Sequence, residues 1–320
     1  MRALELQSID GPAGFAVVER PAPDDGDGRV TIDVRAAGVC FPDLLMSRGK
    51  YQLRPELPAV LGSEVGGTVR FAPVGSAVQP GDRVWATTEL GGFAEVAVAP
   101  DDRVFPLPDA LSFEEGASLG VNFLTAIFAL ERRGALQAGE SVLVLGAAGG
   151  LGTATVSVAK ALGARVIAVV STSEKADTAR AAGADEVVVG AAWRDEVLEH
   201  TGGRGANVVA DIVGGEETLQ AVRSSAPEGR VLVLGFTTGE IPSIATNRLL
   251  LRNVSVIGAG LGALHASVPE LLVDTAAELG RLLDAGLRPI VGETLPLEQG
   301  AEAIRLLEER RAQGKVVLTL

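Results

Sequence analysis

The chain has 320 residues, of which 47% are hydrophobic and 22% are charged, a composition ordinary for a globular protein of about two domains. Its 28 basic and 41 acidic residues give a net charge of −13, and only 4% of the residues are aromatic. A nucleic-acid binder needs a basic face and stacking side chains, so this balance argues against nucleic acid as a partner.

The single cysteine, Cys40, excludes an intramolecular disulfide and a cysteine-rich zinc site. The first ten residues carry Glu5 and no long apolar core, so we expect no signal peptide. The longest apolar stretch, residues 117–130, is interrupted by Asn122 and Thr125 and is shorter than the ~20 residues of a membrane span. We therefore expect a cytoplasmic protein that does not bind membranes.

The first part of the chain, to about residue 110, has the pattern of a β-rich domain. Short apolar runs separated by Gly and Pro predict strands at 29–34, 67–70, 83–86 and 94–98. The segments 21–23 and 24–28 are rich in Pro, Asp and Gly, and we expect exposed loop there.

From residue 117 onward, apolar runs alternate with helical patterns. The runs predict strands at 141–145, 165–170, 187–189, 206–211 and 230–235, with a further strand at 253–258. Helices are expected from the glycine-rich loop to Leu162, at 174–182 and at 216–224. Alternating strands and helices predict an α/β fold with a doubly wound parallel sheet.

The last 60 residues have a different pattern. Amphipathic helices are predicted near 269–285 and 297–310, and an apolar strand is predicted at 315–320. A terminal strand needs a sheet to join, so we expect the C-terminus to return to the N-terminal β domain.

A glycine-rich loop connects the first predicted parallel strand to a helix, and its sequence is GAAGGLG at 146–152. Glycine lets the backbone turn tightly and approach a pyrophosphate, while the start of the helix offers free N–H groups. The small residues Ala154 and Ser157 favour close packing of the helix on the strand. Strand, loop and helix together predict a dinucleotide site; the alternative is a glycine-rich turn that binds nothing.

The end of the next strand indicates which dinucleotide binds. An NAD site places Asp or Glu ~20 residues beyond the loop, on the ribose 2′-hydroxyl. Here Ser171 and Thr172 stand at the strand end and Lys175 follows, and these groups can donate to a 2′-phosphate. The pattern favours NADP(H), although Glu174 could turn inward and the two hydroxyls could simply cap a helix.

A family resemblance covers nearly the whole chain. The motifs that carry it are AAGVCFPDLLMSRGKY (36–51), LPAVLGSEVGGTV (57–69), GDRV (81–84), GGFAE (91–95), TAIFAL (125–130), GESVLVLGAAGGLG (139–152), DIVGG (211–215), GRVLVLGF (229–236) and GKVVL (314–318). With these motifs the chain resembles zinc-independent medium-chain dehydrogenases/reductases of the quinone oxidoreductase (zeta-crystallin-like) family. The resemblance implies a GroES-like β domain at 1–116 and 261–320 around a Rossmann domain at 117–260.

The resemblance also implies roles for particular residues. Cofactor contacts are implied for Cys40, Thr125, Ala148, Gly149, Gly150, Leu151, Gly152, Ser171, Lys175, Val213 and Phe236. Zinc-dependent relatives place their ligands at three positions that are Cys40, Ser63 and Val121 here, and one ligand in three does not hold a catalytic zinc. Homodimers or homotetramers are implied, built by edge pairing of the strand at 254–258.

A metal-free site favours quinones or α,β-unsaturated carbonyls, which accept hydride without a Lewis acid. Tyr51 is the candidate proton donor, although it could serve only as a wall of the substrate site, and Asp43 is more readily explained as a local structural contact. We expect an NADPH-dependent oxidoreductase for a small electrophilic substrate. The alternatives are an enoyl-thioester reductase and a non-catalytic NADPH-binding or structural protein.

Overall fold

The structure is a computed structural model that describes residues 1–24, 26 and 28–320. The expected loop at 24–28 therefore lies partly outside the described residues. The chain forms two compact units, residues 1–121 with 291–320 (unit 1) and residues 122–290 (unit 2). The sequence predicts 117–121 with the Rossmann domain and 261–290 with the β domain. In the structure, 117–121 belongs to unit 1, and helix α10 (Leu271–Asp284) lies in unit 2, where it packs against α3 (Asn122–Ile127).

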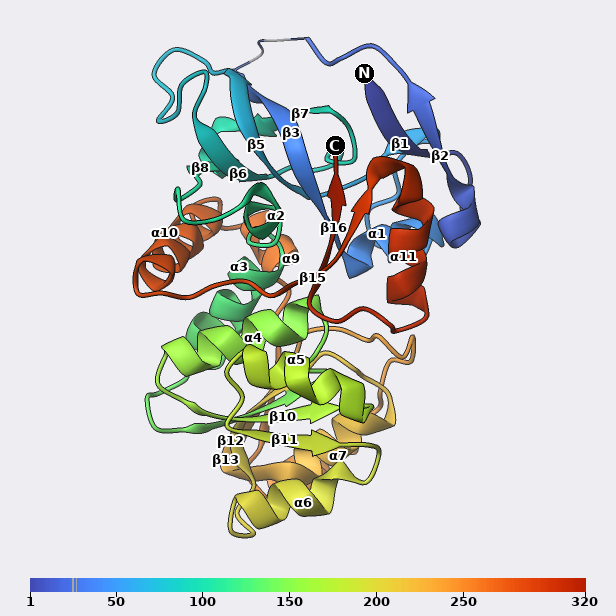
Figure 1. The fold of residues 1–320 in the computed structure, drawn as a ribbon. Coiled ribbons are helices and arrows are strands. Elements are labelled where there is room, and N and C mark those ends of the chain that lie inside the picture. Colours follow the sequence, from blue (N-terminus) through green and yellow to red (C-terminus); the bar gives the residue numbers. More distant parts are fainter. Residues whose placement is uncertain (25, 27) are drawn as a thin grey trace. The chain divides into compact units, whose positions relative to one another are not determined.

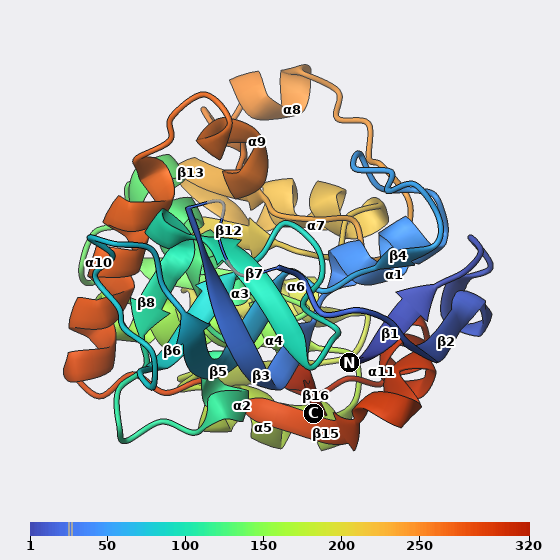
Figure 2. The same ribbon diagram turned by 90° about the horizontal axis from the view of Figure 1, so that it is seen from above.

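Unit 1 contains a seven-stranded, mostly antiparallel sheet (Figure 1). Its strands run in the order β15 (Val291–Pro296), β16 (Lys315–Thr319), β3 (Arg29–Val39), β5 (Glu64–Phe71), β6 (Arg83–Thr87) and β8 (Val104–Pro106), with β7 (Val96–Pro100) also paired to β3. Strand β3 lies beside both β5 and β7, as Figure 2 also shows. A small sheet of β2 (Phe15–Glu19), β1 (Arg2–Leu6) and β4 (Ala59–Val60) and helices α1 (Phe41–Ser47), α2 (Phe113–Gly116) and α11 (Gly300–Glu308) complete the unit.

The C-terminal strand belongs to this N-terminal sheet, as the sequence predicted. β16 pairs antiparallel with β3, with Val316 opposite Val39 and Thr319 opposite Ala36. β15 runs parallel to β16 at the edge. The apolar positions of β16 are buried in the core of unit 1, which explains why the apolar end of the chain requires this sheet.

Unit 2 is built on a six-stranded parallel sheet. Its order is β11 (Glu186–Val189), β10 (Arg165–Val170), β9 (Ser141–Leu145), β12 (Ala206–Asp211), β13 (Ser225–Val233) and β14 (Ser255–Gly258). Helices α4 (Gly150–Ala161) and α5 (Ala176–Ala181) cover one face, and α6 (Trp193–His200) and α7 (Glu216–Ser224) cover the other (Figure 1). The order reverses between β9 and β12, and ligands of doubly wound sheets bind at the carboxyl ends of the strands at such a point.

Several predicted elements match the observed ones residue for residue: the strands at 141–145, 165–170 and 206–211 and the helix at 216–224. The strand predicted at 230–235 instead begins at Ser225 and ends at Val233. The helix predicted at 174–182 is a 3-10 turn, η4 (Ser173–Lys175), followed by α5. Of the residues that the structure describes, none form a helix with the length and apolarity that a bilayer span requires.

Candidate functional site

The glycine-rich loop at the carboxyl end of β9 has two glycines with opposite surroundings. A Cβ on Gly152 would lie 2.2 Å from the carbonyl oxygen of Gly146, so the helix start can press on the loop only without a side chain there. A Cβ on Gly149 would have its nearest neighbour at 3.9 Å, the same oxygen. Gly149 has an ordinary φ of −78°, so neither strain nor protein packing requires glycine at this position. The loop therefore leaves a cradle at Gly149 that a ligand can fill.

The start of α4 presents its amide groups to this cradle. Gly149 caps the helix, so the N–H groups of Gly150, Leu151 and Gly152 belong to its first turn and have no acceptor within the helix. The Thr153 hydroxyl donates to the carbonyl oxygens of Gly149 and Gly150, both at 3.1 Å, and so fixes the turn. The first turn carries no acidic residue, and Ala148 is buried beneath it. A first turn with these features can bind an anion such as a pyrophosphate.

The end of β10 brings together two of the predicted cofactor residues. The Lys175 ammonium lies 3.3 Å from the Ser171 hydroxyl, to which it donates. The carboxylate of Glu174 is occupied locally: hydrogen bonds from its own backbone N–H and from the hydroxyls of Thr172 and Ser173 lower its pKa. Thr172 precedes η4 without capping it through its side chain. An ammonium and a hydroxyl therefore meet at the strand end, while Glu174 is engaged locally and Asp177 pairs with Arg180.

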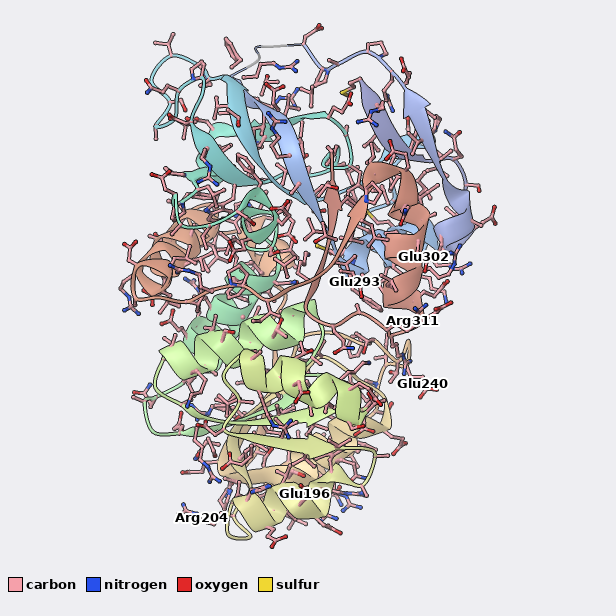
Figure 3. The ribbon with its side chains drawn as sticks, viewed as in Figure 1. Glu196, Arg204, Glu240, Glu293, Glu302 and Arg311 are labelled. Atoms are coloured by element: carbon pink, nitrogen blue, oxygen red, sulfur yellow. The ribbon has the colours of Figure 1, made fainter. Side chains whose placement is uncertain are left out.

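The loops after β12 and β13 complete this end of the sheet in unit 2. A Cβ on Gly146 would lie 3.2 Å from Val213, and one on Gly214 would lie 2.8 Å from the Phe236 ring. The glycine-rich loop, Val213 and Phe236 are therefore neighbours. The backbone of Gly215 donates to the carbonyl oxygen of Glu240, labelled in Figure 3, at 3.0 Å.

Asp211, at the end of β12, is a supporting residue that the sequence analysis missed. It is fully buried, and its Oδ1 atom accepts from the N–H groups of Val213 and Gly214, both at 3.0 Å. Thr218 on α7 donates to its other oxygen. Asp211 therefore fixes the Val213 loop. The sequence signal for this role is an acidic residue at the end of an apolar strand, shortly before two glycines.

The remaining predicted residues are divided between the units. Thr125 is half-buried on α3 of unit 2, whereas Cys40 and Tyr51 belong to unit 1. Tyr51 is half-buried against the unit 1 core, and its hydroxyl has no hydrogen-bond partner within the part of the chain that the structure describes. Burial raises the pKa of Tyr51, as do the neighbouring Cys40 and Asp43, so the phenol stays protonated at neutral pH.

Cys40 lies in a buried polar cluster with Glu64 and Lys315, which the sequence analysis did not single out. Its sulfur is 3.0 Å from the Lys315 Nζ atom and 3.1 Å from Glu64 Oε1, and Lys315 donates to the same carboxylate oxygen. Burial raises the pKa of the Cys40 thiol well above its usual value, and the Glu64 carboxylate adds to this. Burial alone would lower the pKa of Lys315, but the Cys40 sulfur and the Glu64 carboxylate outweigh it and raise this pKa. The cluster is a thiol held by an ammonium–carboxylate pair inside unit 1.

Asp43 has the local structural role that the sequence favoured. It is fully buried, and it accepts the N–H groups of Cys40 at 2.8 Å and Gly62 at 3.3 Å, which fixes the start of α1. Burial raises the pKa of Asp43 to about 7, against the lowering effect of these hydrogen bonds.

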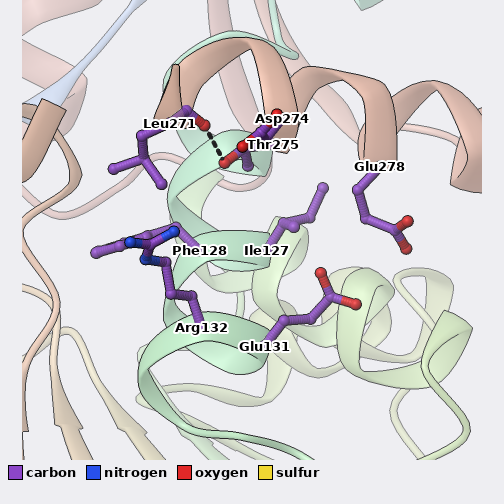
Figure 4. A pocket seen from close by; sticks show the side chains of 8 residues that line it. All are labelled: Ile127, Phe128, Glu131, Arg132, Leu271, Asp274, Thr275 and Glu278. Carbon is purple, nitrogen blue, oxygen red and sulfur yellow. Dashed lines mark hydrogen bonds between the residues drawn. The ribbon is translucent and has the colours of Figure 1, made fainter. Parts of the chain in front are cut away.

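Unit 2 also contains an open hollow of about 330 Å³, lined by residues of α3, of the π-helical turn that follows it and of α10 (Figure 4). Its polar lining is mainly acidic, with Glu131, Asp274 and Glu278 beside Arg132. Burial, together with the charge of Glu278, raises the pKa of Glu131. None of the predicted cofactor residues lines this hollow, and we assign it no part in the chemistry.

A β unit completed by the C-terminal strand, together with a doubly wound unit that carries a glycine-rich loop, defines the class of medium-chain dehydrogenases/reductases. Two family models match the chain: an alcohol dehydrogenase GroES-like domain at residues 26–109 and a zinc-binding dehydrogenase domain at residues 150–278. The observed units correspond to a GroES-like domain and a Rossmann domain, as predicted.

Individual relatives narrow this class. The chain is 37% identical over 296 residues to quinone oxidoreductase-like protein 2 of Bos taurus, and the aligned region covers 91% of this chain and 85% of that protein. It is 32% identical over 329 residues to the quinone oxidoreductase of Sus scrofa, covering 100% and 98% of the two chains. The Thermus thermophilus quinone oxidoreductase, whose structures include a complex with NADPH, is 36% identical, with a TM-score of 0.85 over 100% of both chains. This chain therefore belongs to the quinone oxidoreductase family and is a quinone oxidoreductase-like oxidoreductase.

Proposed function

We propose that this chain is a zinc-independent, NADPH-dependent reductase of quinones or related α,β-unsaturated carbonyls. The observation that carries the proposal is the end of β10, where Lys175 and Ser171 meet while Glu174 is turned to its own backbone. A carboxylate at this place would repel a 2′-phosphate, whereas an ammonium and a hydroxyl donate to one. The solved NADPH complex of the Thermus thermophilus relative supports this choice of cofactor.

The residues of unit 2 fit the proposed cofactor. The cradle at Gly149 and the first-turn amides of α4 would hold the pyrophosphate, and Ser171 and Lys175 would hold the 2′-phosphate. Val213 and Phe236 would exclude water beside the nicotinamide, and Thr125 would bind its amide. In unit 1, the Cys40 sulfur is engaged by Lys315 within the buried cluster.

When bound, NADPH supplies a hydride to the electrophilic carbon of the substrate. The protein then has to place the acceptor and to deliver a proton to the oxygen or carbon that becomes negative. Tyr51 suits the second task, because its phenol is protonated at neutral pH and its hydroxyl is not engaged by the described residues.

The zinc-independent reading is supported by the residues at the three ligand positions. Ser63 and Val121 offer no ligand that zinc prefers, and the Cys40 sulfur already accepts a hydrogen bond from Lys315 at 3.0 Å. A zinc ion on this sulfur would stand beside a buried ammonium of the same charge sign, which is unfavourable.

Parallel assays on the purified chain test the proposal. We expect NADPH oxidation with benzoquinone, slower oxidation with NADH, and unchanged rates after treatment with a zinc chelator. Turnover with crotonyl-CoA but not with benzoquinone would favour an enoyl-thioester reductase. Tight NADPH binding without turnover on a broad panel of electrophiles would favour a non-catalytic NADPH-binding protein.

We also propose that the chain is a cytoplasmic homodimer or homotetramer. The supporting observation is β14, which pairs with β13 on one side and has no second partner strand among the residues that the structure describes. Open sheet edges pair readily with a second copy. Sedimentation of the wild-type chain and of Ile257→Lys tests this: a monomeric wild type would refute the assembly, and a dimeric variant would refute this edge.

A further inference from the structure

The buried cluster of unit 1 lies on one face of the sheet. Lys315 begins β16, Cys40 follows β3 and Glu64 begins β5, so the three residues stand on neighbouring strands at the same end. The pairing of Val316 with Val39 places Lys315 opposite Cys40, and the pairing of Ala37 with Val65 places Gly38 opposite Glu64. Opposite residues, and residues two apart, share a face, so all three side chains meet.

Two glycines make room for the Glu64 side chain. A Cβ on Gly38 would lie 2.7 Å from Glu64 Cγ, and one on Gly120 would lie 3.3 Å from Glu64 Oε2. The carboxylate therefore passes between β3 and the segment at Gly120 and Val121. Its Oε1 atom meets Lys315 and Cys40, and its Oε2 atom accepts the backbone N–H of Val121 at 2.8 Å.

Val121 is the last residue of the first segment of unit 1, and α3, with Thr125 on it, begins at the next residue. Glu64 is fully buried and Lys315 is 2% exposed. Burying such a pair is costly, and apolar residues of similar volume often serve stability as well or better. An apolar pair, however, would leave the Val121 N–H without its acceptor.

We propose that Lys315 is a positioning residue: its ammonium neutralises and orients Glu64, and the carboxylate thereby fixes the Val121 amide and the chain entry into α3. A buried carboxylate gives the strong, charge-assisted hydrogen bond to this amide, and its burial requires a counter-charge nearby. The functional part of this proposal rests on the proposed function, because it assigns Thr125 to the nicotinamide.

Three variants separate positioning from simple stability. K315M removes the ammonium, E64Q/K315M removes both charges but retains an acceptor oxygen, and E64L/K315M removes both charges and the acceptor. R230M is the matched control, because Arg230 pairs with Glu140 in unit 2 with side chains only 19% and 22% exposed. If K315M does not fold, the comparison of the two double variants still tests whether the acceptor at residue 64 positions Val121.

The first measurement is hydrogen exchange of the Val121 amide in the full chain without cofactor. We expect exchange roughly tenfold or more faster in E64L/K315M than in wild type, and close to wild type in E64Q/K315M and R230M, because a hydrogen-bonded amide is protected from exchange. Equal exchange rates in wild type and E64L/K315M would show that Glu64 does not fix the Val121 amide.

The second measurement is the KM for NADPH beside the midpoint of urea unfolding. We expect the KM to rise roughly tenfold in E64L/K315M and to recover in E64Q/K315M, although both variants unfold at similar urea concentrations. A KM that follows the unfolding midpoint, including that of R230M, would overturn the positioning role. Failure of the wild type to bind NADPH would instead overturn the proposed function, so the two failures come from different measurements.

Discussion

The missing side chain of Gly152 lies against the carbonyl oxygen of Gly146, where a Cβ would come within 2.2 Å. A Cβ on Gly149, three residues earlier, would reach nothing closer than 3.9 Å. One glycine is therefore required by the packing of the protein itself. Packing does not require the other, and under the proposed function it makes room for the cofactor, so the two substitutions to alanine separate folding from binding.

Gly149→Ala is expected to fold normally and to lose cofactor. Its φ of −78° suits alanine, and the stability cost of this change at a helix N-cap is less than about 1 kcal/mol. The added methyl group would fill the cradle, so NADPH affinity should fall by roughly tenfold or more, as measured by calorimetry. Unchanged affinity in a folded variant would show that the cradle is not the pyrophosphate site.

Gly152→Ala is expected to be destabilised. Its methyl group would meet the backbone of Gly146 and Ala147, which cannot move aside without shifting the loop. Overpacking of this kind costs roughly 1–3 kcal/mol in urea unfolding. A variant as stable as wild type would contradict the packing described for the loop. The Gly149→Ala protein serves as the control for an added methyl group in the same loop.

Lys175→Ala should weaken NADPH binding selectively. The ammonium beside Ser171 would be lost, and charge-assisted bonds to a phosphate contribute about 1.5–3 kcal/mol, so the Kd for NADPH should rise by about tenfold or more. The Kd for NADH should stay nearly constant, because NADH has no 2′-phosphate. Lys160→Ala is the matched control, since Lys160 pairs with Asp185 on the surface of the same unit. Equal losses for both cofactors would refute the assignment of Lys175.

Tyr51→Phe should lower turnover and spare NADPH affinity. The substitution removes only the hydroxyl, and a positioned proton donor contributes about 10²–10⁴-fold to rate where solvent cannot replace it. Because solvent can protonate a quinone product, we expect kcat with benzoquinone to fall by roughly tenfold. Steady-state kinetics beside an NADPH titration measure this, and an unchanged kcat would leave Tyr51 as a wall of the substrate site.

The sequence predicted the elements of unit 2 well because local pattern and tertiary role agree there. After Ser141, the run at 142–145 is apolar throughout because this strand is buried on both faces, and the glycines at 146–152 mark a turn with one well-known geometry. β15 was missed, since its sequence, VGETLP, places polar residues on an edge strand with no clear alternation. β1 and β2 lie in a region that the sequence marked only as β-rich.

The supporting residues were harder to predict than the loop. A lysine that heads an apolar strand normally stays in water, and only the register of β16 on β3 places Lys315 against Cys40 and Glu64. Glu64 lies 251 residues from Lys315 in the chain, so no local pattern connects them. The same holds for the contact of Val213 with Gly146, which depends on the order of strands in the sheet.

Asp43 predicts how the stability of the protein depends on pH. Burial raises its pKa to about 7 in the folded chain, whereas an unfolded aspartate has a pKa of about 3.9. Between these values the folded state binds a proton that the unfolded state does not. The contribution of Asp43 is therefore fully present below pH ~4, is lost as the pH rises to about 7, and is constant above that.

Asp43→Asn isolates this contribution, because asparagine retains an acceptor for the Cys40 N–H and does not titrate. The unfolding free energy of wild type relative to the variant should fall by roughly 2–3 kcal/mol from about pH 5 to about pH 8. Asp33→Asn is the control, since Asp33 is 44% exposed beside Arg70. A wild-type advantage that instead stays constant from about pH 5 to about pH 8 would mean that Asp43 is ionised throughout this range and that the N–H groups of Cys40 and Gly62 outweigh its burial.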